Sequence, residues 1–149
     1  IAKNEPDKTL ICRNISTAKW ALFGGQRYAE KFGLPKSLND LQGHRFVSFE
    51  HDDVPDHEHS WLLRHVSPEQ IVMSFSEPEL MQASVRAGHV LGLVNLRLAA
   101  GDAGLIRCFG DIEELTRSNM MLIAPDAHRR HEVKAFTKFF APRYAAIFK

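Results

Sequence analysis

Short runs of apolar residues, rich in β-branched and aromatic side chains and bounded by turn-forming residues, recur along the whole chain. Runs of this length and composition are typical of β-strands. The pattern predicts strands over Thr9–Ile15, Lys19–Phe23, Arg45–Phe49, Trp61–Arg64, Gln70–Phe75, Val90–Val94, Leu105–Phe109 and Ser118–Ala124. We expect the Gly24-Gly25 pair to end the second of these strands.

Helix start and stop signals between these runs predict short helices. The segment Gln26–Phe32 precedes Gly33 and Pro35, a pair that commonly follows a helix end. A helical turn is expected after Ser37, ending near Gly43, and another short helix over Asn95–Ala100.

Two longer helices are predicted. One runs from a Ser76 cap to about Ala87, and its expected buried stripe is Leu80, Met81, Ser84 and Val85. The other covers Arg129–Phe148, where Pro142 is expected to kink or interrupt the helix. Its apolar residues near one face are Val133, Phe136, Phe139, Phe140 and Ile147.

The alternation of strands and helices indicates an α/β fold with largely parallel sheets. A length of 149 residues allows one ordinary domain or two small lobes. Five aromatic residues alternate with other apolar residues at strand spacing, so we expect them in the core rather than in a ligand cage: Trp20, Phe23, Phe46, Phe49 and Phe75.

Charge and hydropathy restrict the possible partners. Lys plus Arg total 19 and Asp plus Glu total 18, a net charge of +1 that excludes a wholly basic nucleic-acid-binding domain. No run of 18 apolar residues is present, so no transmembrane helix and no membrane partner are predicted. No signal peptide opens the chain, although a start at Ile1 leaves a signal further upstream open.

Catalytic motifs are missing: the chain has no G-x-S-x-G, no H-E-x-x-H and no P-loop, and we predict no enzyme and no cofactor. The predicted loop over Glu50–Ser60 could offer nitrogen and oxygen ligands to a divalent metal from His51, Asp52, Asp53, Asp56, His57, Glu58 and His59. The alternative, which the mixed spacing favours, is a solvated charged loop without metal. Two cysteines, Cys12 and Cys108, are too few for a disulfide scaffold and fit a reducing compartment.

The order of several short motifs resembles the effector-binding (substrate-binding) domain of LysR-type transcriptional regulators. The first part of the resemblance rests on Tyr28, Gly33, Pro35 and the Asp40-Leu41-x-x-His44 pattern. Further along, a helix end and a glycine-containing strand match at Ser84-Val85-Arg86-Ala87-Gly88 and Gly92. The last part includes Leu105 and a terminal helix with Val133, Ala135, Phe136 and Phe139. The order and spacing of these motifs carry the resemblance, since no single motif is specific.

This resemblance implies a type II periplasmic-binding-protein-like fold, with two α/β lobes joined by two crossover strands and a small-molecule cleft between the lobes. Residues 1–18 are then part of the first lobe and a crossover, residues 19–106 form the second lobe, and residues 107–149 form the other crossover and return to the first lobe. The first lobe is expected to be incomplete. The family's N-terminal winged helix-turn-helix, which binds DNA, is expected outside this chain.

Helix starts are the candidate ligand-binding positions, because helix N-termini carry unpaired N–H groups and partial positive charge. The resemblance implies that three of them face the cleft, with the candidate residues Gly25, Gln26, Ser76, Glu77, Val94 and Asn95. Two of these pairs depart from the family: Gly25-Gln26 stands for Ser-Pro, and Val94-Asn95 for Leu-Pro. The competing interpretation is that Ser76 only caps a helix, Gln26 is solvated and the glycines only turn the chain.

Three other features each have a functional and a structural interpretation. His44 is either a pH-sensitive switch or a partner of a local backbone group. Cys12 and Cys108 either pair as a redox-sensitive hinge or stay inert, buried thiols. The acidic segment 50–58 and the basic terminal helix either attract each other between subunits or are both solvated.

The favoured prediction is the effector-sensing domain of a bacterial LysR-type regulator. A small molecule binds the cleft and stabilises one hinge state, which controls DNA binding by the N-terminal domain. The regulator is expected to be cytoplasmic and homo-oligomeric, with Val133, Phe136 and Phe140 as a packing face and the strand Ser118–Ala124 as an edge open to pairing. The alternatives are a solute-binding protein of a transport system on the same fold, and an enzyme that uses the segment His51–His59.

Overall fold

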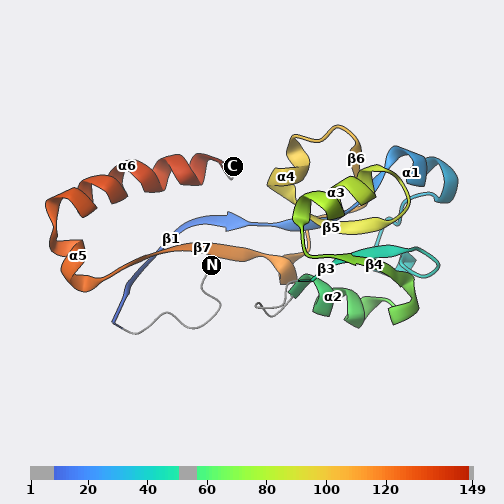
Figure 1. Ribbon diagram of the computed structural model, residues 1–149, viewed down its shortest axis with the longest axis horizontal. Coiled ribbons are helices and arrows are strands. Elements are labelled where there is room, and N and C mark those ends of the chain that lie inside the picture. The colour runs from blue at the N-terminus through green and yellow to red at the C-terminus, as the bar shows by residue number, and fades with distance from the viewer. Residues whose placement is uncertain (1–8, 51–56, 148–149) are drawn as a thin grey trace. The chain divides into compact units, whose positions relative to one another are not determined.

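The computed structural model describes residues 9–50 and 57–147, which fall into two compact units (Figure 1). Unit 1 comprises the described parts of Ile1–Ala18 and Thr116–Lys149, and unit 2 comprises those of Lys19–Leu115. Residues beyond Arg107 still pack in unit 2: the Ile112 N–H donates to the Trp20 carbonyl at 2.9 Å, and Leu115 is buried in its core. The contacts of unit 2 therefore extend to Leu115.

Unit 2 is built on a five-stranded sheet with strand order β4-β3-β5-β2-β6. Its strands are β2 (Trp20–Gly25), β3 (Phe46–Phe49), β4 (Ile71–Phe75), β5 (Leu91–Asn95) and β6 (Leu105–Arg107). Strand β3 is parallel to β4 and β5, whereas β2 is antiparallel to β5 and β6. The sheet is mixed, so the expectation of largely parallel sheets is wrong; β2 inserts between two strands that run the opposite way.

Helices cover both faces of this sheet, because its central strands are apolar on both sides. On β2, Leu22 packs into one cluster with Tyr28 of α1 (Gln26–Phe32) and Trp61 of α2 (His57–His65). Its neighbours Ala21 and Phe23 face the other cluster, with α3 (Pro78–Arg86) and α4 (Leu96–Ala100). Figure 1 shows α2 and α3 on opposite sides of the strands. The expected aromatic core is confirmed, since all five residues belong to or pack against these clusters.

The prediction of a strand over Trp61–Arg64 is wrong, because this segment lies in helix α2. Trp61 and Leu62 are 0% and 1% exposed while Leu63 is 46% exposed, a helical pattern. An apolar run of three residues is too short to distinguish the periods of a helix and a strand. The helix also begins at His57, inside the segment predicted as a loop.

Among the predicted element boundaries that shift, two concern candidate ligand-binding residues. Strand β2 continues through Gly24 and Gly25 instead of stopping there. Helix α3 has Glu77 as its N-cap rather than Ser76, with Pro78 in the first position. Of its predicted buried stripe, Met81 and Val85 are buried but Leu80 is 55% exposed.

Short 3-10 helices complete unit 2: η1 (Leu38–Asp40), η2 (Pro68–Gln70) and η3 (Glu113–Leu115). The first follows Ser37, whose hydroxyl accepts a hydrogen bond from the Asn39 N–H at 3.3 Å, as its predicted capping role requires.

Unit 1 is a two-stranded antiparallel ribbon of β1 (Ile11–Ala18) and β7 (Arg117–Ile123), followed by α5 (Pro125–Arg129) and α6 (His131–Ile147). The predicted terminal helix corresponds to α6, α5 before it was not predicted, and Pro142 lies inside α6 without ending it. Helix α6 packs against β1 and buries Thr137 and Ala141. Two residues of the predicted apolar face, Phe136 and Phe139, are 56% and 58% exposed.

Candidate functional site

The carboxyl ends of three parallel strands meet at one edge of the unit 2 sheet. Strands β3, β4 and β5 end at Phe49, Phe75 and Asn95. The helix after β3, α2, packs on one face of the sheet, and the helix after β5, α4, packs on the other. The connections therefore change side between the neighbouring strands β3 and β5. In open α/β sheets, ligands bind outside the carboxyl ends of strands at such a switch point. We call this edge the carboxyl edge.

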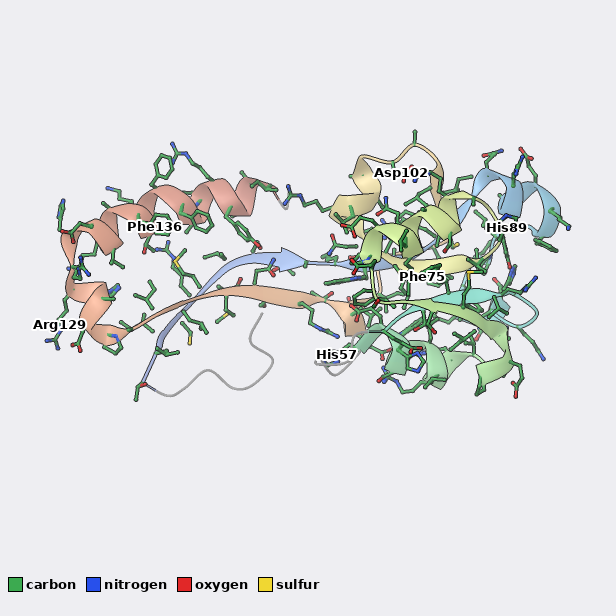
Figure 2. The ribbon with its side chains drawn as sticks, viewed as in Figure 1. His57, Phe75, His89, Asp102, Arg129 and Phe136 are labelled. Carbon is green, nitrogen blue, oxygen red and sulfur yellow. The ribbon has the colours of Figure 1, made fainter. Side chains whose placement is uncertain are left out.

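A hydrogen-bonded group of side chains lies at the ends of β3 and β4. The fully buried Ser48 hydroxyl is hydrogen-bonded to His59 Nδ1 at 2.8 Å, and the same nitrogen is 3.4 Å from Glu50 Oε1. The Ser74 hydroxyl donates to Glu50 Oε1 at 2.8 Å. Helix α2 thus brings His59 to the end of β3, and Glu50 links this pair to Ser74 of β4. Figure 2 shows His57, the first residue of α2, at the end of that helix near the sheet. The group offers hydroxyl, imidazole and carboxylate atoms to a polar ligand.

The end of β5 carries Asn95, which caps α4: its Oδ1 accepts a hydrogen bond from the Arg97 N–H at 3.0 Å. The next residue donates its N–H to the Lys19 carbonyl at 2.9 Å, which places Lys19 at the same edge. Lys19 Nζ is 2.7 Å from Asp111 Oδ2, and this contact holds the pKa of the Asp111 carboxyl below its usual range. Lys19 is therefore already ion-paired within the protein.

The end of β4 continues into Ser76 and Glu77, both exposed. Because Glu77 occupies the N-cap position of α3, the Ser76 side chain is not needed to cap the helix. Val94 has a different environment, since its side chain is 2% exposed and belongs to the core cluster under α3 and α4. Ser76, Glu77 and Asn95 thus share the carboxyl edge, while Val94 contributes only backbone there.

Gly25 and Gln26 lie at the opposite edge of the sheet, so the structure does not bring the six predicted residues together. Strand β2 runs antiparallel to β5, and its first residue, Trp20, pairs with Asn95. Gly25, at the other end, packs against the last turn of α3: a Cβ there would lie 2.6 Å from the carbonyl oxygens of Val85 and Arg86. Gln26 donates to Glu30 at 2.8 Å along α1. The direction of β2, which the sequence did not reveal, separates these residues from the carboxyl edge.

His44 is held by a tyrosine rather than by the backbone bond considered from the sequence. The Arg45 N–H donates to the Tyr28 hydroxyl at 3.2 Å, and Tyr28 Oη lies 2.9 Å from His44 Nδ1. Since that hydroxyl accepts one hydrogen bond, its own proton is available to the imidazole nitrogen, which favours a neutral ring. Burial lowers the pKa of His44, opposed by the charge of Asp40, and burial raises the pKa of Tyr28.

The two cysteines are free thiols in different units. Burial raises the pKa of the Cys108 thiol to about 12, so it stays protonated and unreactive at neutral pH. Cys12 is exposed, which corrects the expectation that both thiols are buried.

The candidate metal segment lies partly outside the described residues, which omit His51, Asp52, Asp53 and Asp56. Within the described ranges, no group of three or more His, Cys, Asp or Glu side chains is arranged to hold a metal ion. Over the same ranges, every helix is too short or too polar to cross a membrane.

Four polar residues at the carboxyl edge were not predicted as effector-binding residues, although His59 was considered as a metal ligand: Ser48, Glu50, His59 and Ser74. The sequence contains one indication of this site, because Ser48 is a polar residue within the predicted strand Arg45–Phe49. A buried hydroxyl needs a hydrogen-bond partner, and a partner must come from a neighbouring element. The sequence could not identify that partner because His59 was placed in a loop.

Comparison with known proteins identifies relatives over most of the chain. The family described as LysR substrate binding domain matches residues 1–145. A search of curated proteins found no match. Among solved structures, the full-length virulence activator AphB of Vibrio cholerae, described as a member of the LTTR protein family, is 19% identical, with a TM-score of 0.67 over 91% of this chain and 48% of AphB.

Two further structures give the same result. The regulatory domain of CrgA, a LysR-type transcriptional regulator from Neisseria meningitidis, is 16% identical with a TM-score of 0.67 over 95% of this chain and 72% of that domain. Full-length CbnR in complex with its target DNA is 18% identical with a TM-score of 0.65 over 95% of this chain and 50% of CbnR. The chain thus spans about half the length of the full-length regulators.

These likenesses show the fold, and the family match covers nearly every residue. The architecture is the type II periplasmic-binding-protein-like α/β fold expected from the sequence, with mixed sheets. The chain belongs to the LysR substrate binding domain family.

Proposed function

We propose that this chain is the effector-sensing part of a LysR-type transcription regulator and that a small molecule binds at the carboxyl edge of unit 2. The observation that carries the proposal is the convergence at this edge of polar side chains from β3, β4, β5 and α2, in a chain of this family. The binding residues are Glu50, His59, Ser76, Glu77 and Asn95. Gly25, Gln26 and Val94, candidates from the sequence, act in packing or lie outside this group.

The chemistry of the edge favours a hydrogen-bonding effector over an anion. Glu50 and Glu77 place carboxylates there, and the Lys19 charge is paired with Asp111. These carboxylates would repel an anionic effector, whereas a neutral or amine-bearing polar molecule could donate to their oxygens.

Binding shifts the population of conformations of the regulator, and this change reaches a DNA-binding domain outside the chain. The regulator works without catalysis, in the cytoplasm and as a homo-oligomer. Transport on the same fold is not favoured, because the solved neighbours are named as transcription regulators. The stacked rings of Phe136, Phe140 and Tyr144 on α6, with centroids 5.2 and 5.3 Å apart, are a candidate contact between subunits.

A ligand screen with a matched pair of variants tests the proposal. Small polar compounds are screened by the rise in the melting temperature of the chain, because a ligand that binds only the folded state stabilises it by about 2.7 kcal/mol at a hundred times its Kd. The hit is then titrated against Ser76→Trp and Gln26→Trp. Both replace exposed residues next to a helix start, at opposite edges of one sheet.

We expect Ser76→Trp to abolish the stabilisation and Gln26→Trp to retain it. In the intact regulator, Ser76→Trp should lose the transcriptional response to the effector and Gln26→Trp should retain it. Equal binding by both variants, or loss only in Gln26→Trp, would contradict the carboxyl edge as the site.

A further inference from the structure

Unit 1 contains a groove of about 470 Å³ between β1 and α6, and its lining shares no residue with the proposed effector site. Figure 1 shows α6 running along β1. The groove is lined by Arg13, Asn14, Ile15, His128, Lys134, Thr137, Lys138, Ala141, Pro142 and Ala145. Its volume is within the range of small-molecule sites in proteins.

A β-bulge explains how three successive residues of β1 reach the same groove. Asn14 pairs with Met120 and Ser16 with Asn119, so Ile15 is an extra residue without a partner in the ribbon. In a regular strand, successive side chains point to opposite faces, and a bulge re-aims them. Arg13, Asn14 and Ile15 can therefore all line the groove.

Helix α6 supplies the other wall from one of its faces. Lys134, Lys138, Ala141 and Ala145 recur every three or four residues, the spacing of neighbours on a helix surface. The small side chains leave room above β1, and together with Ile15 and Pro142 they form an apolar floor.

The rim of the groove is cationic. Arg13, Lys134 and Lys138 carry positive charge, and the described lining residues include no Asp or Glu. This is the reverse of the carboxyl edge of unit 2, where Glu50 and Glu77 are exposed. An anion would be attracted to the groove and disfavoured at the edge.

An independent observation also indicates a missing hydrogen-bond partner. The Nδ1 atom of His128 is buried, and no described residue of the protein forms a hydrogen bond with it. Most buried polar side-chain atoms in proteins have such a partner, so an orphaned one in a groove wall requires explanation. A ligand oxygen could accept a hydrogen bond from a protonated Nδ1.

We propose that this groove is a second binding site, for a small organic anion with a carboxylate head and an apolar body. The carboxylate contacts Arg13, His128 and one of the two lysines, Lys134 or Lys138. The apolar body lies on Ile15, Ala141 and Ala145. The proposal does not depend on the proposed function of unit 2, because it concerns different residues and the opposite charge. A second copy of β1 is a poor occupant, since it would bring the same cations into the groove.

Octanoate is the probe, with neutral octanamide as its uncharged counterpart. Amide NMR spectra of the chain report which residues respond, and calorimetric titration gives the Kd. The variants are Lys138→Gln, which removes a groove cation, and Arg143→Gln on the same helix. Arg143 is the matched control, because it does not line the groove and its Nη1 donates to the Phe139 carbonyl at 2.9 Å. Thermal unfolding verifies that both variants are folded.

We expect octanoate to shift resonances of residues 13–15 and 134–145, and octanamide to bind at least tenfold more weakly. Lys138→Gln should raise the Kd for octanoate about tenfold, the effect of one lost charge-assisted contact, while Arg143→Gln changes it less than about twofold. Ser76→Trp should leave octanoate binding intact, which separates this site from the effector site. The proposal is overturned if octanoate shifts no groove resonance, if it binds at the carboxyl edge, or if both charge variants weaken it equally.

Discussion

The two units of this chain differ in how completely they bury their own strands. In unit 2, a five-stranded sheet has a hydrophobic cluster and helices on each face. In unit 1, the described residues form two strands, and Met120 and Leu122 on β7 are 45% and 36% exposed. A two-stranded ribbon is at most marginally stable alone. Most of the stability of the described structure must therefore reside in unit 2.

The units also differ in the chemistry that they present. The carboxyl edge of unit 2 combines carboxylates with hydroxyl groups, whereas the groove of unit 1 combines cations with an apolar floor. Both surfaces arise where a regular strand pattern ends or breaks: at the carboxyl ends of β3, β4 and β5, and at the bulge in β1. Within a regular sheet the backbone N–H and C=O groups are hydrogen-bonded to neighbouring strands. Binding surfaces therefore form where strand pairing stops or is interrupted.

Truncation of one phenylalanine in each unit gives the largest expected contrast. Phe46 lies on β3, between β4 and β5, and is 0% exposed. Phe46→Ala should lower the free energy of unfolding by about 3–5 kcal/mol, because it leaves a cavity in the core. Phe136→Ala in α6 should cost about 1 kcal/mol or less, because that ring is 56% exposed and stacks on Phe140 at the surface of α6. Urea unfolding of both variants measures the difference. Equal losses of unfolding free energy in the two variants would contradict the difference in burial between the two units.

A pair of glycines tests the packing that separates Gly25 from the effector site. Gly25→Ala should destabilise the protein by about 1–3 kcal/mol, because its Cβ would lie 2.6 Å from two backbone carbonyl oxygens of α3. Gly101→Ala is the control, since φ there is −91° and no atom lies within 4 Å of the added carbon. Its effect should stay within about 0.5 kcal/mol. If urea unfolding showed no loss of stability in Gly25→Ala, the close approach of α3 would not explain why this position is a glycine.

The smallest effect concerns pH and should be confined to unit 2. The pKa of His44 is lowered by burial from an ordinary value of 6.5, so below that value the unfolded chain binds more protons than the folded one. Stability from the neutral ring is complete above pH 6.5 and is lost as the pH falls through the lowered pKa. We expect unfolding free energy to fall between pH 7 and pH 5, and to fall less in His44→Gln.

An exposed histidine of the same unit provides the control for this titration. The control variant is His89→Gln, which removes an exposed histidine of unit 2 and leaves the Tyr28–His44 pair in place. Figure 2 shows His89 close to α1, away from the labelled Phe75 at the end of β4. An NMR titration of the imidazole resonances gives the pKa of His44 directly. A value above 6.5 would contradict the downward shift of this pKa.

Local patterns predicted most elements but not the direction in which each strand runs. Helix Gln26–Phe32 was predicted with its observed bounds, because Gly33 follows it with φ of 72°, a conformation that favours glycine. The segment at Trp61 was mistaken for a strand because three apolar residues fit both periods. Of the predicted site, Ser76, Glu77 and Asn95 share one edge, whereas Gly25 and Gln26 do not.

The sequence alone determined the family, the α/β composition and the aromatic core, because these depend on the order and spacing of residue types along the chain. Only the tertiary structure decided which helix starts share an edge, that His59 reaches Ser48 and Glu50, and that three residues of β1 line one groove. Strand direction, sheet order and bulges are long-range properties: they depend on pairings between residues far apart in sequence, which no local pattern encodes.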